Sequence, residues 1–80
     1  MNNQRKEGLD LYDHSKLRGR IIEKYGSISE FSAALGVSLT TISEKLNNKT
    51  GLSRADIDRW NELLGISTDE IGAFYFAKTV

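Results

Sequence analysis

Residues 27–48, SISEFSAALGVSLTTISEKLNN, decide the fold of this chain. Ser27 and Glu30 stand three residues apart, which is the spacing of a capping box, so we expect a helix to begin directly after the serine. Apolar residues from Phe31 onward share one helical face. Gly36 then stands where a left-handed residue ends a helix at little cost. The pattern predicts a short helix followed by a tight turn.

A second short helix follows the turn. Ser38 is a favourable N-cap, and Ile42 and Leu46 are spaced to face inward from the helix that it begins. Val37 is expected to fill the corner between the two helices. Two short helices joined by a tight turn are typical of a helix-turn-helix.

The same stretch carries the residue types of a known motif at the matching positions. Phe31 takes the position usually held by Leu, and Ser32 takes the small position where the two helices touch. Residues 35–38 (LGVS) match the turn, and residues 41–43 (TIS) match the middle of the second helix. The chain therefore resembles the Cro- and repressor-type helix-turn-helix family, and in particular small phage-encoded regulators, over about residues 12–76. Its segments LRGRIIEKYG, SEKLNNKT and ELLGI support the resemblance.

The resemblance implies an all-α, five-helix, lambda-repressor-like DNA-binding domain. It further implies a transcription regulator that reads the major groove of an operator with the helix at about 39–48. A domain of this size buries little surface on DNA, so a homodimer on a palindromic site is expected. Two positions differ from the family pattern, because Ile28 stands where Gln is common and Leu39 where a polar or basic residue is common.

The exposed residues of the second helix are the candidate DNA contacts. Short side chains would let the helix lie deep in the major groove, where hydroxyls and methyl groups meet base edges. The candidate base contacts are Leu39, Thr40, Thr41, Ser43 and Glu44. The candidate phosphate contacts are Arg18, Ser27, Ser38, Lys45, Asn47, Asn48, Lys49 and Thr50. Without the motif, the same residues would be an ordinary solvated helix face.

The flanking sequence predicts three further helices and a mobile N-terminal arm. Residues 1–11 lack periodicity and form the arm, which leaves residues 12–80 as one domain. The first helix is expected to begin near Ser15 and to end near Tyr25, with His14 at the surface. Residues 53–64 predict another helix, and a short fifth helix is expected to end near Gly72. The final residues, AFYFAKTV, have strand-like composition.

Composition excludes several classes of protein. The chain has no Cys and one His, so a thiolate or multi-histidine metal site cannot form. No apolar run is long enough to cross a membrane, and no signal-peptide core is present, so a cytoplasmic protein is expected. Phosphate-binding and dinucleotide-binding glycine patterns are missing as well. We expect no enzyme activity, no cofactor and no small-molecule ligand.

Charge favours a second interpretation. The 80 residues carry eleven basic and eleven acidic side chains, whereas a duplex-binding protein usually has an excess of Lys and Arg. The distribution is uneven, with six basic and four acidic residues in 1–25 and three basic and five acidic in 51–80. The alternative is a protein-interaction module, such as an antirepressor or assembly factor, built on the same fold.

Three consecutive aromatic residues stand near the C-terminus. Phe74, Tyr75 and Phe76 cannot all face the core of so small a domain, so this segment is a candidate dimer surface. The equally open alternative is that two of the three pack back onto the domain.

Overall fold

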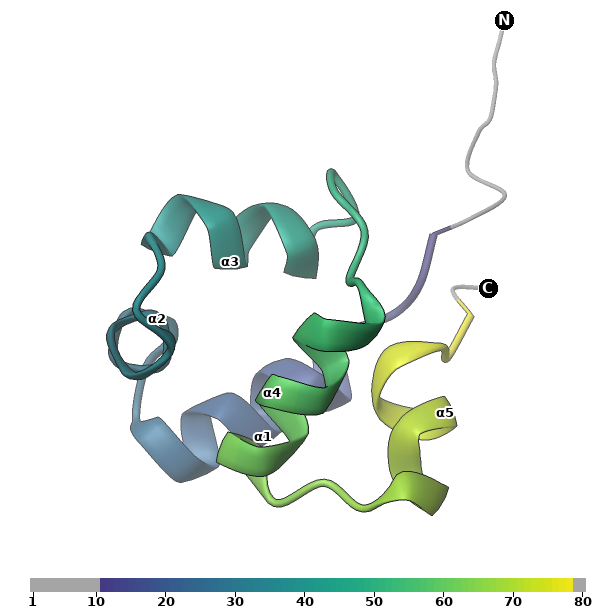
Figure 1. Cartoon of the computed structure of the whole chain (residues 1–80). Helices are drawn as coiled ribbons and strands as arrows, with labels where there is room; N and C mark the ends of the chain where they lie inside the picture. Colours follow the sequence, from purple (N-terminus) through teal and green to yellow (C-terminus); the bar gives the residue numbers. More distant parts are fainter. Residues whose placement is uncertain (1–10, 79–80) are drawn as a thin grey trace, which may run out of the picture.

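The computed structural model describes residues 11–78, which form five α-helices and one short 3-10 helix (Figure 1). The predicted all-α, five-helix class is confirmed. In chain order the elements are α1 Ser15–Tyr25, α2 Ile28–Leu35, α3 Leu39–Leu46, α4 Arg54–Leu64, the 3-10 helix Thr68–Glu70 and α5 Ile71–Tyr75. Most of the predicted N-terminal arm lies outside the described residues. No helix among residues 11–78 is long and apolar enough to span a membrane.

Local hydrogen bonds fix the ends of α2 and α3. The Ser27 hydroxyl accepts a hydrogen bond from the Glu30 N–H at 3.0 Å, and the Ser38 hydroxyl accepts one from the Thr41 N–H at 3.1 Å. Both serines therefore act as the predicted N-caps. Gly36 ends α2 with a φ of +77°, a backbone conformation that side chains with a Cβ rarely adopt.

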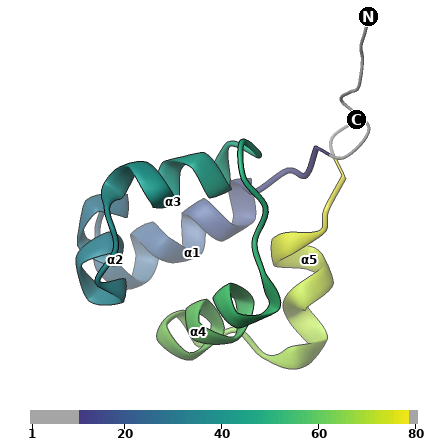
Figure 2. The same cartoon turned by 45° about the horizontal axis from the view of Figure 1, so that its top comes forward.

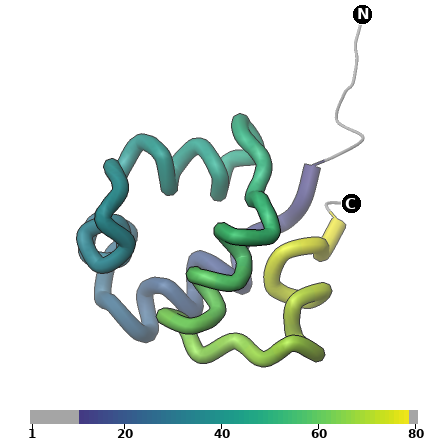
Figure 3. Tube along the Cα trace, viewed as in Figure 1, coloured from purple at the N-terminus to yellow at the C-terminus, as the bar shows by residue number. Residues whose placement is uncertain are grey.

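The helices surround one core. Figures 1 and 2 show α2 at one end of the domain, between α1 and α3, and α5 at the opposite end beside α1 and α4. The trace in Figure 3 passes from α3 to α4 through a loop on the side where the chain enters α1. The buried apolar residues come from all five helices and one loop: Leu17, Ile21, Phe31, Ile42, Leu46, Ile57, Trp60, Leu64, Ile66, Phe74 and Tyr75.

The corner between α2 and α3 is filled differently from the prediction. Val37 is 42% exposed, so the prediction that it fills this corner is wrong. The small residue Ser32 is buried there instead, and its hydroxyl donates to the Ser29 carbonyl at 2.7 Å. The Ser32 carbonyl in turn accepts a hydrogen bond from the Val37 N–H at 3.1 Å. This bond holds the backbone of the turn next to Ser32, and the Val37 side chain stays exposed.

The segment before α1 is tied to the end of α3. The Asn48 side chain donates to the Tyr12 carbonyl at 2.9 Å and accepts from the Tyr12 N–H at 3.2 Å. His14 Nδ1 lies 3.2 Å from the Leu46 carbonyl oxygen, and the ring is only 6% exposed. The prediction that His14 lies at the surface is wrong, because this long-range packing covers it.

The C-terminal segment is helical as far as Tyr75. The 3-10 helix Thr68–Glu70 begins at the predicted Ser67 cap and continues into α5. The prediction of a helix that ends near Gly72 is therefore wrong, and so is that of a strand-like conformation for residues 73–75, while residues 79–80 lie outside the described part of the chain. The only strand-like pairing among the described residues is an isolated antiparallel bridge between Tyr12 and Lys78.

Two of the three C-terminal aromatic residues belong to the core. Phe74 is 2% and Tyr75 1% exposed, whereas Phe76 is 46% exposed. The Lys16 ammonium and the Arg20 guanidinium each lie 4.9 Å from the Phe74 ring centroid and make cation–π contacts with the ring. The dimer prediction is wrong for Phe74 and Tyr75, and the alternative that two of the three pack back onto the domain is confirmed.

Truncation of the two phenylalanines should separate core from surface. Phe74→Ala should lower the free energy of unfolding by about 3–5 kcal/mol, because it opens a cavity in the core. Phe76→Ala should change it by less than about 1 kcal/mol. Urea unfolding followed by circular dichroism at two protein concentrations measures both. If the midpoint of the wild type depended on protein concentration and that of Phe76→Ala did not, Phe76 would instead lie in a dimer interface.

Candidate functional site

The outward side of α3 gathers most of the predicted base-contacting residues. A shallow open hollow on this side is lined by six residues, which we call the α3 face: Leu39, Thr40, Ser43, Glu44, Asn47 and Lys49. Leu39 is an exposed large apolar residue, and the side chains of Ser43 and Glu44 are half-buried. The structure thus brings together four of the five predicted base contacts.

Thr41, the fifth predicted base contact, points elsewhere. It is half-buried, and its hydroxyl lies 2.9 Å from the Ser38 hydroxyl at the start of α3. It lines a separate hollow together with Val37 and Arg59, between the α2–α3 turn and α4. Thr41 therefore lies apart from the α3 face, because its helical position turns it toward α4.

Lys45, the only cation of α3, is held inside the molecule. Its ammonium lies 3.0 Å from the Asp56 carboxylate and donates to the Gly51 carbonyl at 3.2 Å. Only 17% of the Lys45 side chain is exposed. This ion pair connects α3 to the first turn of α4, so the predicted phosphate contact is a structural tie in this fold.

Three more of the predicted phosphate contacts, Arg18, Asn47 and Asn48, are engaged by internal hydrogen bonds. Arg18 of α1 donates to the Asn47 side chain at 2.6 Å, which joins the start of α1 to the end of α3. The Asn48 side chain is committed to the backbone of Tyr12. Sequence reasoning missed these pairs because their members stand 29 and 36 residues apart. Lys49 and Thr50 follow α3 and are exposed.

The α3 face is close to electrically neutral. Its two charged side chains are Glu44, from the middle of α3, and Lys49, from the loop that follows. The Ser27 and Ser38 hydroxyls, which were also predicted to contact phosphate, accept hydrogen bonds as N-caps. The face therefore offers hydroxyls, one amide, one carboxylate, one ammonium and an exposed leucine.

Asp56 is held in its charged form by its neighbours. Burial by itself raises the pKa of this carboxyl, but hydrogen bonds from the Ser53 N–H and the Lys45 ammonium outweigh burial and hold the pKa below its ordinary value of 3.8. The same carboxylate completes the capping box of α4. Asp56 thus stabilises the start of α4 and the position of α3 together.

Comparison with known proteins now identifies the family. The family described as "Protein of unknown function (DUF739)" matches residues 11–78, which is the whole described part of the chain. The chain belongs to the DUF739 family. No curated protein matches it.

A solved structure of a phage regulator has the same fold. It is the solution structure of the modulator of repression (MOR) of the temperate bacteriophage TP901-1 from Lactococcus lactis. The two proteins superpose with a TM-score of 0.76 at 33% sequence identity, over 92% of this chain and 100% of that one. This DUF739 protein is therefore similar to a small phage regulatory protein. The sequence resemblance implied a small phage regulator, and this part of it agrees with the comparison.

The lowered pKa of Asp56 predicts how stability depends on pH. A carboxyl with a lowered folded-state pKa stabilises the fold above its ordinary pKa, and this contribution is lost as the pH falls through the folded value. Asp56→Asn should cost about 1–2 kcal/mol at pH 7 and should flatten the loss of stability below about pH 4. Urea midpoints between pH 2 and pH 7 measure this.

A neighbouring carboxylate provides the control. Asp58 is 62% exposed and pairs only with the exposed Arg54, so Asp58→Asn should change the midpoints little. Equal effects of the two substitutions would contradict a special role for Asp56.

Proposed function

We propose that this DUF739 protein regulates phage gene expression by binding a repressor protein through the α3 face. The observation that carries the proposal is the ion pair between Lys45 and Asp56, which removes the only cation of α3 from the surface. The helix that would read DNA then contributes Glu44 as its one free charge. Such a surface favours a protein partner over a polyanion.

Electrostatics support a protein partner. Affinity for duplex DNA comes largely from Lys and Arg that neutralise phosphates. The chain carries as many acidic as basic side chains. Four of the eight predicted phosphate contacts have side chains that bind other parts of the molecule: Arg18, Lys45, Asn47 and Asn48. The exposed cations that line the hollows beside α3 are then Lys49 and, from α4, Arg59, and so few contacts support only weak attachment to DNA.

The chemistry of the α3 face suggests which partner surface it fits. Leu39 is 47% exposed and provides an apolar centre, with the hydroxyls of Thr40 and Ser43 beside it. Glu44 would pair with a basic group across the interface. A repressor has a basic surface where it contacts phosphate, so binding there would compete with its operator. The name of the TP901-1 relative, modulator of repression, agrees with this role.

A second candidate function is sequence-specific DNA binding by the chain itself as a homodimer. The arrangement of α2 and α3 and the short hydroxyl side chains of Thr40 and Ser43 favour it, since such side chains meet base edges in the major groove. Either role places the protein in the cytoplasm of the bacterial host and assigns it no catalytic activity.

A binding experiment with the repressor of the encoding phage tests the first proposal. Calorimetry should detect binding of the wild-type chain, and Leu39→Asp should weaken it at least about tenfold, because it buries a charge at the centre of the interface. Glu62→Ala, on the exposed side of α4, is the matched control and should bind as the wild type does. Lack of binding by the wild-type chain would contradict the proposal.

Selection of duplexes from a random library tests the second. We expect no enriched sequence for the chain alone and only weak mobility shifts that vanish with added salt. Enrichment of a palindrome, with binding abolished by Thr40→Asp but unchanged in Glu62→Ala, would establish the DNA-reading role instead.

A further inference from the structure

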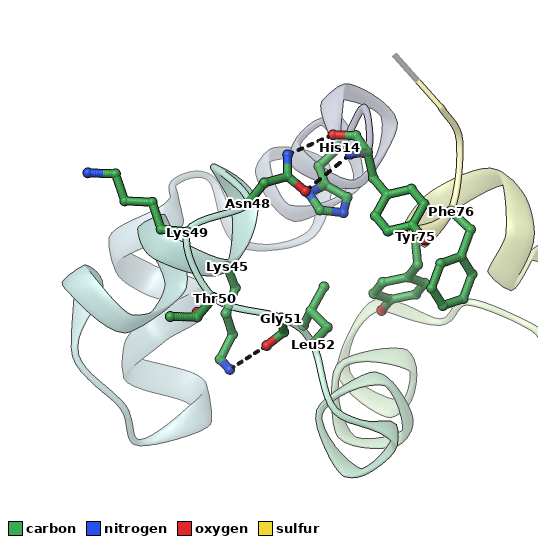
Figure 4. Close-up of a pocket in the computed structure, with 10 residues that line it drawn as sticks. His14, Lys45, Asn48, Lys49, Thr50, Gly51, Leu52, Tyr75 and Phe76 are labelled. Carbon is green, nitrogen blue, oxygen red and sulfur yellow. Dashed lines mark hydrogen bonds between the residues drawn. The ribbon is translucent and has the colours of Figure 1, made fainter. Parts of the chain in front are cut away.

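A cavity of about 330 Å³ lies next to the α3 face, with which it shares Lys49. It forms where three segments distant in sequence meet: the residues before α1, the loop between α3 and α4, and the end of α5 (Figure 4). The lining residues that matter here are Tyr12, His14, Leu52, Tyr75 and Phe76. Its size is at the lower end of the range for small-molecule sites in proteins.

The imidazole of His14 gives the cavity a defined polar group. His14 Nδ1 lies 3.2 Å from the Leu46 carbonyl oxygen, and a carbonyl can only accept, so Nδ1 carries the proton in the neutral ring. His14 Nε2 is then a hydrogen-bond acceptor. It is fully buried and has no hydrogen-bond partner among residues 11–78. Figure 4 shows the ring directed into the space above Leu52 and Tyr75.

A buried acceptor of this kind selects a ligand with a hydrogen-bond donor. An unpaired buried polar atom costs free energy that a matching group recovers on binding. The hydroxyl of Tyr75 does not serve His14, because it donates to the Asn61 side chain at 2.8 Å. The donor must therefore come from outside the described residues.

The rest of the lining has two parts. Lys45, Asn48, Lys49, Thr50 and Gly51 line it from the end of α3 and the loop that follows, and the other part is aromatic or apolar. Tyr12 and Phe76 meet edge to face with ring centroids 5.4 Å apart, and Phe76 is 46% exposed at the opening. The buried ring of Tyr75 and the side chain of Leu52 complete the floor. Aromatic walls favour a flat aromatic guest, because offset and edge-to-face contacts add to the area that it buries.

We propose that this cavity binds an aromatic ring that carries a hydrogen-bond donor, an indole or a phenol, with the donor on His14 Nε2. The proposal is independent of the role of the α3 face. It replaces the sequence-based expectation of no small-molecule ligand, because the cavity exists only through contacts between distant segments. The ring is either a free metabolite or the Trp or Tyr side chain of a partner protein.

A matched pair of probes tests the hydrogen bond. Indole and 1-methylindole have the same ring, but only indole has an N–H. In ¹H–¹⁵N NMR titrations of the full chain, indole should shift the amides of Tyr12, Leu52 and Phe76 and the Nε2 resonance of His14. We expect 1-methylindole to bind about tenfold more weakly and to leave the Nε2 resonance in place. Equal affinities, or no shifts with indole, would overturn the proposal.

Variants locate the site. Leu52→Trp fills the cavity and leaves His14 in place. It should abolish the chemical-shift changes that indole causes, while the circular dichroism spectrum stays that of the folded helical protein. Leu39→Ala, on the α3 face, is the control and should bind indole as the wild type does. Retained binding in Leu52→Trp would place the ligand elsewhere and overturn the assignment.

A third probe distinguishes the two sources of the ring. N-acetyltryptophanamide carries the indole on a peptide-like backbone. Binding of this probe with an affinity like that of indole would support a side chain from a partner protein. Binding of indole alone would support a free small molecule.

Discussion

The contact between Phe31 and Trp60 is the interaction on which the rest of the fold depends. Their rings meet edge to face with centroids 5.1 Å apart, and both side chains are almost completely buried. Tyr25 packs on Phe31 at 5.4 Å, and Tyr75 packs on Trp60 at 6.4 Å. This aromatic series joins α1, α2, α4 and α5 at the centre of a small core. Ile42 and Leu46 attach α3 to the same core, which fixes the side that α3 turns outward.

Polar ties then decide what the surface can bind. Lys45 and Asp56 hold α3 against α4, and the Asn48 side chain holds the end of α3 against the residues before α1. Each tie stabilises the position of α3 and at the same time removes a side chain from contact with another molecule. The α3 face that remains is nearly neutral, with Leu39 as its large apolar residue. The same packing forms the cavity around His14, which adjoins this face at Lys49.

The helix starts and turns were predictable because their causes are local. The capping serines at 27, 38 and 53 contact backbone only three residues away, and Gly36 takes the left-handed conformation that its position required. The C-terminal prediction failed for a reason that lies outside the segment. AFYF has strand-like composition, but Phe74 and Tyr75 both bury in the core, and tertiary burial outweighs a weak local preference.

Local patterns in the sequence predict an all-helical domain, the bounds of its first four helices within a residue or two, and the outward side of α3 that carries Leu39 and Thr40. Three other features follow from the tertiary structure: Lys45 is an internal ion-pair partner, His14 is buried, and Phe76 alone of its aromatic group is exposed. The difference lies in how far apart in the sequence the interacting residues stand. Caps and turns are hydrogen bonds between near neighbours, whereas burial and pairing depend on residues that folding brings together from distant parts of the chain.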